Sequence, residues 1–325
     1  EIHERLVGSE MCIRDRDLCK LLAKHLPTSL EVTYLTNSGT EAIEGAMKLA
    51  KRVTGRGGFI AAKKAYHGST QGALSLLGVE QQKEGYGPLL AEVEFVTFNA
   101  FDELTKITTK TAGVVLETIQ GGGGFILPAK EYLLAVKKRC DEVGALLILD
   151  EIQPGIGRTG KLFAFEHYGI TPDILVIGKG LGGGMPIGAF CSSAQNMETL
   201  THSPSLGHIT TFGGNPVIAA AGLATLQTII NKKLMAEIDA KEALFRECLV
   251  HPKIKQINGR GLMLAPILEN PEQVSKVVFS CLEKGLILFF LLWEKKGIRL
   301  SPPLNISKRE IRKGCKILLE ALDEL

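Results

Sequence analysis

The feature that most constrains this chain is the alternation of short apolar runs with segments of helical period. Runs rich in aliphatic residues predict strands at residues 32–36, 58–62, 93–98, 112–117, 145–150, 173–180 and 188–193. Amphipathic segments at 40–53 and 129–144 predict helices between some of these strands. Strands that alternate with helices form mostly parallel sheets with both faces covered, so we expect an α/β fold.

The pattern changes after residue 193. Helical periods occupy 216–230 and 233–249, and the remainder mixes a helix near 271–284, the apolar run 285–293 and a closing helix from Lys308. This later part predicts a smaller α+β unit, with a soft boundary near 231–235. We therefore expect a large domain at 17–232 and a small C-terminal domain at 233–325.

Residues 1–16 do not fit either unit. Their charges are mixed without periodicity, and VGSEMCIRDR resembles translated sequencing-adapter read-through more than a natural segment. A poorly ordered native terminus is the ordinary alternative. We expect a non-native or disordered leader and leave it out of the fold argument.

Composition excludes several classes of protein. A net charge of +3 over 325 residues, with no dense basic run, argues against nucleic-acid binding. The apolar runs are far shorter than the roughly 20 residues of a membrane helix, and no secretory signal opens the chain. The 7 cysteines show no C-x-x-C spacing or Cys/His cluster, which predicts reduced thiols, no metal site and a cytoplasmic protein.

The stretch DEIQPGIGRTGK at 150–161 contains G-x-G-x-x-G and nearly ends as a phosphate-binding loop. A dinucleotide turn must follow its strand directly, whereas four residues separate Asp150 from Gly155. A magnesium-nucleotide loop needs Ser or Thr after its lysine, and Leu162 stands there. We therefore expect the glycines to form a tight loop that follows the surface.

Polar residues end two of the most apolar expected strands. Asp150 closes one and Lys179 the next, and ligands of open parallel sheets bind beyond such strand ends. Pyridoxal phosphate requires a lysine for its Schiff base and a carboxylate that keeps the pyridine nitrogen protonated. A solvent-facing lysine is the alternative for Lys179 taken alone.

Two further stretches suit the same cofactor. TNSGTEA places Ser38, Gly39 and Thr40 at a helix start, where backbone N–H groups can bind phosphate, although an ordinary helix cap fits equally. The YHG stretch brings Tyr66 beside His67, and a flat ring there could stack on a cofactor or simply pack in the core.

Together the chain resembles the class III pyridoxal-phosphate aminotransferases, which include acetylornithine, ornithine, 4-aminobutyrate and putrescine enzymes. The resemblance runs from about residue 17 to 325 and rests on NSGTEA, AYHG, VVLETIQGGGG, LILDEIQPGIGRTGKLFAFEHYGITPDILVIGKGLGGGMPIGA, HITTFGGNP and IRLSPPL. It implies the aspartate-aminotransferase type of fold (fold type I) and a homodimer with active sites at the subunit interface. It also implies a small-molecule amino donor and a keto-acid acceptor.

The resemblance also assigns roles to residues. Lys179 would form the Schiff base and move the proton, Asp150 would pair with the pyridinium nitrogen, and Gln153 would approach the phenolic oxygen. The other residues that it places at the cofactor or substrate are Ser38, Gly39 and Thr40 at the phosphate, Tyr66 on the ring with His67 beside it, Glu117 next to the cofactor, Thr211 on the phosphate of the partner subunit, and Arg299 on a substrate carboxylate.

The sequence departs from the family in two places. Many members have glutamate where this chain has Gly122, and the usual N-terminal region is replaced by residues 1–16. Because a glutamate there can neutralise Arg299, glycine predicts a preference for donors that carry a carboxylate over simple diamines, unless Gly122 merely eases a turn. We expect an acetylornithine- or ornithine-like donor and 2-oxoglutarate as acceptor. The alternatives are putrescine or another ω-amine, a pyridoxamine-dependent aminomutase, and a truncated cofactor-binding chain with little turnover.

Overall fold

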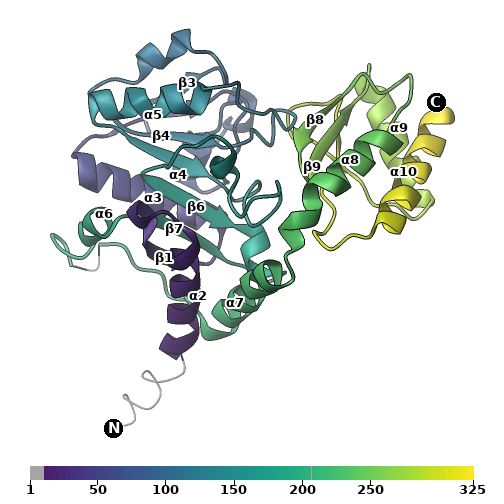
Figure 1. Ribbon diagram of the computed structural model, residues 1–325. Coiled ribbons are helices and arrows are strands. Elements are labelled where there is room, and N and C mark those ends of the chain that lie inside the picture. Colours follow the sequence, from purple (N-terminus) through teal and green to yellow (C-terminus); the bar gives the residue numbers. More distant parts are fainter. Residues whose placement is uncertain (1–10, 206) are drawn as a thin grey trace.

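The computed structural model describes residues 11–205 and 207–325, which form two units (Figure 1). The larger unit is built on a seven-stranded sheet with the order β1-β7-β6-β5-β4-β2-β3. Its strands are β1 (Val32–Thr36), β2 (Gly58–Ala62), β3 (Val93–Val96), β4 (Thr111–Glu117), β5 (Leu146–Asp150), β6 (Ile174–Gly178) and β7 (Gly188–Ser192). β7 pairs antiparallel with both neighbours and the remaining pairs are parallel, so this is the mostly parallel sheet expected of the fold.

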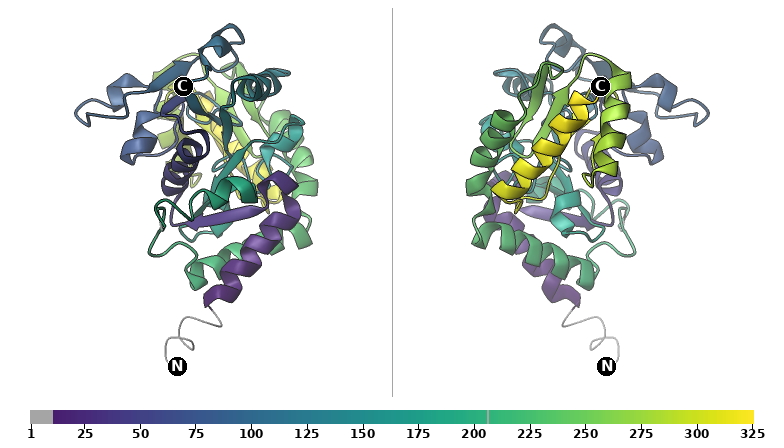
Figure 2. Two further views of the ribbon diagram at one scale, coloured as in Figure 1. Left: turned by 90° about the vertical axis from the view of Figure 1, so that its left-hand side faces the viewer. Right: turned by 90° about the vertical axis from the view of Figure 1, so that its right-hand side faces the viewer.

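Helices cover both faces of this sheet. The buried residues of α3 (Gly39–Thr54), α4 (Gln71–Ser75) and α6 (Ala194–Glu198) pack on one face. Those of α2 (Met11–His25), α5 (Tyr132–Val143) and α7 (Pro216–Asn231) pack on the other, and α2 runs along α7 (Figure 2). Alternate strand residues point to opposite faces, which is why nearly all residues of β4 to β7 are buried.

The smaller unit has its own apolar core. It contains α8 (Ile238–Cys248), α9 (Pro271–Glu283) and α10 (Lys308–Asp323), which pack on the hairpin of β8 (Gln256–Arg260) and β9 (Met263–Ile267). A second hairpin joins β10 (Phe289–Phe290) to β11 (Ile298–Arg299). Only two residues of the expected apolar run 285–293 are therefore strand. The expected division into domains at 232/233 falls between α7 and the short 3₁₀ turn η6 (Leu234–Glu237), and it stays a prediction.

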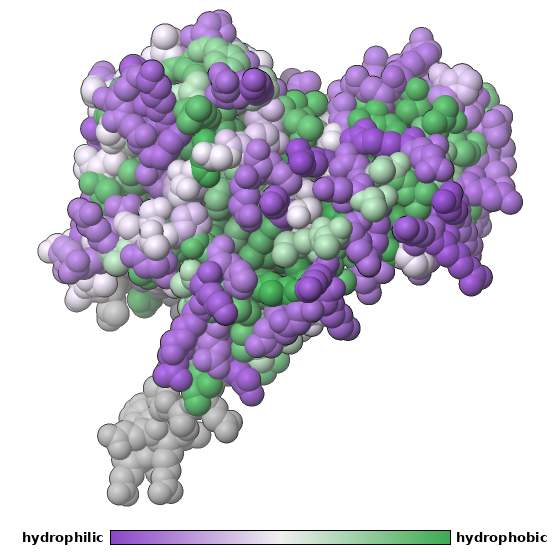
Figure 3. Space-filling model, in the orientation of Figure 1, coloured by the Kyte–Doolittle hydropathy of each residue, from purple (hydrophilic) through white to green (hydrophobic). Residues whose placement is uncertain are grey.

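A small apolar cluster joins the two units. Its larger-unit members are Ile119, Phe125 and Ala164, and its smaller-unit members are Met263, Ala265, Ile267 and Leu291. In the space-filling view, polar side chains cover most of both units, while apolar residues gather near the middle of this face (Figure 3). We call the contact surface around this cluster the seam.

The structure differs from the sequence interpretation at one end and in one loop. Residues 11–16 of the expected leader are helical, because α2 starts at Met11, and residues 1–10 lie outside the described part of the chain. A non-native origin of the leader stays a prediction. The G-x-G-x-x-G segment at 155–160 does not follow the surface, because most of it is buried under the smaller unit. At Gly157, where φ is +83°, a Cβ would lie 3.0 Å from Leu304 and 3.2 Å from Met235. Sequence reasoning missed this because the covering residues are about 75 to 145 positions away.

Candidate active site

The residues singled out at strand ends meet at one edge of the large sheet. Parallel register places Glu117 opposite Asp150 at the carboxyl ends of β4 and β5, and Asp150 opposite Val176, two residues before the end of β6. Lys179 follows β6 directly, and the loop after β2 brings His67 to the same edge. The crevice beyond these strand ends is where open α/β sheets bind ligands.

Lys179 starts a 3₁₀ turn and has a φ of +42°, a backbone region that is uncommon for a residue with a Cβ. Its side chain is accessible from a cavity, yet the surrounding protein displaces enough water for desolvation to lower the pKa of the amine. Asp150 and Glu117 oppose this shift, while the charge of Arg299 adds to it. Such an amine loses its proton more readily than a surface lysine, as a proton-transferring group must.

Asp150 is held at the base of the site by two hydrogen bonds. His67 Nδ1 lies 2.8 Å from Asp150 Oδ2, and the N–H of Ile152 donates to Oδ1 at 2.9 Å. Burial opposes protonation of His67, but the hydrogen bond and charge of Asp150, with the charge of Glu117, outweigh it and raise the pKa of the imidazole. His67 therefore orients the Asp150 carboxylate. The sequence had suggested only that His67 lies near the cofactor.

Glu117 is the second buried acid of this edge. Its Oε1 accepts the N–H of Gly121 at 3.0 Å, and its Oε2 has no hydrogen-bond partner within the described residues. Burial is the main reason that the pKa of Glu117 rises to about 7, with His67, the Gly121 N–H and Lys179 acting against it and Asp150 adding to it. The free oxygen and a free buried Nε2 on His67 mark polar groups that a bound molecule could satisfy.

The first turn of α3 can bind an anion. Ser38 caps the helix by accepting the N–H of Glu41 at 3.3 Å, which confirms a cap without excluding a ligand, since its hydroxyl hydrogen remains available. The N–H groups of Gly39 and Thr40 lie in the first turn, where no intrahelical acceptor exists. Gly68, at φ +136°, lets the following loop approach Thr40 closely, because a Cβ would lie 2.2 Å from Thr40 Oγ1.

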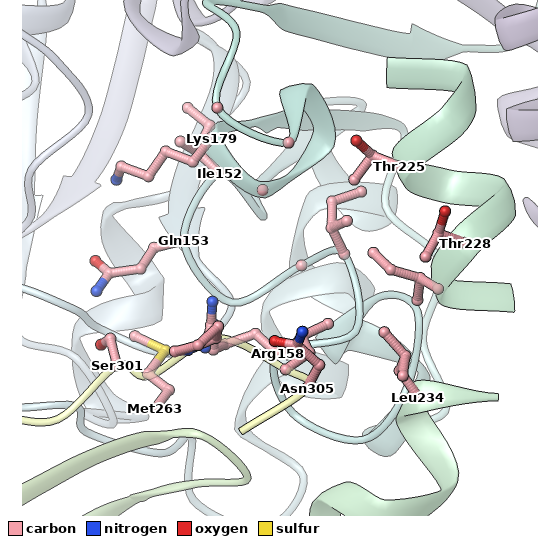
Figure 4. Close-up of a pocket in the computed structure, with 18 of the residues that line it drawn as sticks. Ile152, Gln153, Arg158, Lys179, Thr225, Thr228, Leu234, Met263, Ser301 and Asn305 are labelled. Atoms are coloured by element: carbon pink, nitrogen blue, oxygen red, sulfur yellow. The ribbon is translucent and has the colours of Figure 1, made fainter. Parts of the chain in front are cut away.

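Tyr66 and Gln153 lie in the loops after β2 and β5. The Tyr66 side chain is 37% exposed, and its hydroxyl lies 3.0 Å from Ser69 Oγ, so its ring remains accessible for stacking. Gln153 projects into the same cavity as Lys179 (Figure 4). Thr211 is exposed and is not among the residues that line that cavity.

The cavity has a volume of about 710 Å³ and lies between the two units. Lys179 and Gln153 line one part, Thr225 of α7 another, and Ser301 and Asn305 of the smaller unit a third (Figure 4). Its cations are Lys179, Arg158 and Arg299, and no Asp or Glu is among its lining residues.

The two arginines differ in their partners. Arg158 Nη1 donates to the carbonyl oxygen of Pro302, and burial together with the charge of Arg299 lowers its pKa to about 10. Burial alone lowers the pKa of Arg299, with no carboxylate of the described residues acting against it. Sequence reasoning predicted Arg299 but missed Arg158, Ser301 and Asn305. The GRTG and RLSPPL motifs contain two of them and could have suggested the contact.

A third buried acid, Glu151, also escaped sequence reasoning. Its carboxylate accepts the hydroxyl of Thr118 and the N–H groups of Ala164 and Phe165, each at 2.7 Å. Burial is again the largest influence and raises its pKa to about 7. Glu151 does not line the cavity. Its hydrogen bonds to Ala164 and Phe165 hold the loop after β5 in place.

These residues fit pyridoxal phosphate. The site offers a lysine, a carboxylate fixed by His67, an accessible aromatic ring and a helix start with free N–H groups. Among the described residues, no three His, Cys, Asp or Glu side chains form a group that could hold a metal ion. In that same part of the chain, no helix is both long and apolar enough to cross a membrane.

Comparison with known proteins gives consistent matches. Residues 11–322 match the class-III aminotransferase family. The chain is 40% identical over 304 residues to the acetylornithine aminotransferase of Caldanaerobacter subterraneus, covering 90% of this chain and 76% of that protein. It is 39% identical over 325 residues to the putrescine aminotransferase of Pectobacterium atrosepticum, covering 95% and 69%.

Solved structures agree with the fold. The ornithine aminotransferase of Toxoplasma gondii ME49 has a TM-score of 0.88 and 29% identity, covering 95% of this chain and 76% of that one. A Bacillus anthracis aminotransferase has a TM-score of 0.90 and 28% identity, covering 98% and 82%. Another Toxoplasma gondii structure reveals partial occupancy of pyridoxal phosphate at its active site. The chain therefore belongs to the class III aminotransferases and is a pyridoxal-phosphate-dependent transaminase of fold type I.

Proposed function

We propose that this enzyme moves the ω-amino group of an acetylornithine- or ornithine-like donor to 2-oxoglutarate in a ping-pong reaction. The observation that carries this proposal is the charge of the cavity, which is lined by three cations and no acid. An uncompensated cation in a partly dry pocket favours ligands with carboxylates, and arginine can bind a carboxylate through two parallel hydrogen bonds. The relatives that act on acetylornithine and ornithine support the same class of donor.

The residues of the chain divide the chemistry between them. Pyridoxal phosphate, when bound, supplies an electron sink that stabilises negative charge developing beside its ring. Asp150, fixed by His67 and the Ile152 N–H, would hold a proton on the ring nitrogen. Lys179, whose amine has a lowered pKa, would hold the cofactor and would take and return the substrate proton. Gln153 would contact the phenolic oxygen, and Tyr66 would stack on the ring.

The remaining contacts concern the phosphate and the substrate. Gly39 and Thr40, with Ser38, would bind the phosphate at the start of α3. Arg299 would bind the carboxylate of 2-oxoglutarate or of the donor, and Glu117 would face the cofactor with its unpartnered oxygen. Each of these groups already lies on a strand end, a helix start or the hairpin β10–β11, so little rearrangement is needed.

The test is a panel of amines incubated with 2-oxoglutarate, with glutamate formation measured for each. We expect acetylornithine and ornithine to exceed putrescine, which has no carboxylate for Arg299. Putrescine is the second candidate because of the 39% identical relative. Equal or faster turnover of putrescine would overturn the preferred donor, and product formation without any keto acid would point to an aminomutase.

We also propose a homodimer that shares its active sites. Thr211 lies away from the cavity of its own chain, and its neighbours Ile209, Phe212 and Val217 are 66–67% exposed. Apolar side chains this exposed favour a protein interface. Sedimentation should give twice the mass of the chain, and Thr211→Val should weaken cofactor binding. A monomer with full cofactor affinity would contradict this arrangement.

A further inference from the structure

The glycines that follow β4 lie directly under the smaller unit. We call residues 121–124 the glycine loop. The N–H of Trp293 donates to the Gly122 carbonyl at 2.9 Å, and Asn258 Nδ2 donates to the Gly124 carbonyl at 3.0 Å. Trp293 lies in the connection between β10 and β11, the strand that contains Arg299. The loop is thus held by Trp293 from the hairpin that contains Arg299, and by Asn258 from β8.

The indole of Trp293 explains why residue 122 is glycine. A Cβ at Gly122 would lie 2.7 Å from both Cδ1 and Nε1 of Trp293, closer than real Cβ contacts come. Gly122 is not at positive φ, so the constraint is the indole and not the backbone conformation. The indole occupies the space into which any side chain at position 122 would extend.

The opposite side of the same loop faces the cofactor edge. The Gly121 N–H donates to Glu117 Oε1 at 3.0 Å, and a Cβ at Gly121 would lie 2.6 Å from Gln153 Oε1. Two neighbouring residues therefore make these two contacts: Gly122 contacts Trp293 of the smaller unit, and Gly121 donates a hydrogen bond to the buried Glu117. Glu117 has no other hydrogen bond in the described structure that could hold its carboxylate if this one were lost.

We propose that Trp293 is a positioning residue: by clamping Gly122 it fixes the Gly121 N–H on Glu117 and so couples the substrate side of the cavity to the cofactor side. The coupling rests on the proposed cofactor site. The packing of Trp293 against Gly122 does not, because it is present in the cofactor-free protein. The groups that face Glu117 are His67, Asp150, Lys179 and the Gly121 N–H, and only the last depends on the clamp. Loosening the loop removes a hydrogen bond that favours the ionised carboxylate.

The clamp is tested by a double-mutant cycle on cofactor-free protein. Gly122→Ala should lower the urea midpoint of the wild type. The same substitution should lower the midpoint much less in a Trp293→Ala background, because the indole is absent there. Gly123→Ala is the matched control, because its Cβ would meet Gln120 and not Trp293. The penalty for Gly123→Ala should be the same in both backgrounds. An equal penalty for Gly122→Ala in both backgrounds would overturn the clamp.

The coupling is tested by the titration of Glu117. Its protonated carboxyl can be followed by infrared difference spectroscopy, with the band assigned by its loss in Glu117→Gln. We expect Trp293→Ala to move the midpoint to higher pH and to lower kcat about tenfold or more, as small misplacements do. Trp293→Phe, which keeps a ring on Gly122, should restore most of both. An unmoved midpoint in Trp293→Ala would overturn the coupling while leaving the cofactor assignment intact.

Discussion

The two sides of the cavity are built in different ways. On the large-sheet side, Asp150 and Glu117 are paired in strand register, and hydrogen bonds from His67, Ile152 and Gly121 fix their carboxylates. On the smaller-unit side, Arg299 lies on a two-residue strand, and no carboxylate of the described residues pairs with it. A rigid, buried set of acids suits chemistry common to a family, whereas an unpaired cation on a short hairpin suits the selection of one substrate.

The seam decides how these two sides face each other. Its apolar cluster and the glycine-loop contacts come from residues more than a hundred positions apart. Substitutions on the large-sheet side should therefore change cofactor attachment and kcat. Those on the smaller-unit side should change KM and donor choice.

Lys179→Ala should show the largest effect on the large-sheet side. Without the amine the cofactor cannot be attached covalently, and we expect activity to fall by at least about 10⁶-fold. Borohydride reduction of the wild type should fix the cofactor to the peptide that contains Lys179, and the variant should take up none. Lys161→Ala, an exposed lysine outside the cavity lining, is the control and should retain the label. Label on any other peptide would contradict the assignment.

Asp150→Ala and Asp150→Asn should keep some bound cofactor but lower kcat by about 10²- to 10³-fold, because the ring nitrogen loses its charged partner. The neighbouring Glu151→Gln is the matched comparison. It should lower the urea midpoint more than it lowers kcat, since Glu151 holds loop N–H groups outside the cavity. If Asp150 variants kept the wild-type kcat, Asp150 would only end its strand.

On the smaller-unit side, Arg299→Lys should raise KM for carboxylate substrates by about 10- to 100-fold, because a paired guanidinium contact is lost. Its effect on KM for putrescine should be small. Arg158→Lys is the comparison, and because Arg158 binds the Pro302 carbonyl it should mainly reduce stability. If Arg299→Lys changed KM equally for ornithine and putrescine, Arg299 would not be the residue that selects the donor.

Gly122→Glu was the natural test of the glycine at that position, but the structure shows that it would strike Trp293. The informative variant is Gly122→Glu combined with Trp293→Ala. Relative to Trp293→Ala, it should shift preference toward putrescine by about fivefold, since a partly exposed charge pair changes binding by about 1 kcal/mol. Kinetics with ornithine and putrescine measure this ratio, and an unchanged ratio would mean that residue 122 only shapes the loop.

Stability should also depend on pH through Glu117. Burial raises the folded-state pKa of Glu117 from 4.5 to about 7. Between these values the unfolded chain has released a proton that the folded chain retains, so stability falls as pH rises through this window. Glu117→Gln lacks that loss of stability. Its free energy of unfolding relative to the wild type should therefore be greater above pH 7 than at pH 4, by up to about 3 kcal/mol. Urea unfolding of the cofactor-free proteins at both pH values measures it, and a pH-independent difference would contradict the shift.

Much of the large unit could be predicted from sequence. Strands β1, β2 and β7 and helices α3 and α7 lie within one or two residues of expectation, because each has a clear period and a turn or cap at its ends. Parallel strands bring their carboxyl ends to one edge, so the proximity of Asp150 and Lys179 also followed from the pattern. The sequence did not indicate the first turns of α2, because residues 11–16 have mixed charge and no evident period.

The sequence by itself determined the sheet, the sheet edge at which the polar residues gather, and the residue types that suit pyridoxal phosphate. These features depend on local period and on strand direction. Only the tertiary structure decided that His67 binds Asp150, that the loop 155–160 is buried, and that Trp293 fills the space beside Gly122. Each of these contacts joins segments about 80 to 170 residues apart. Contacts between such distant segments depend on how the chain packs in three dimensions. No local pattern in the sequence indicates which of these segments will meet.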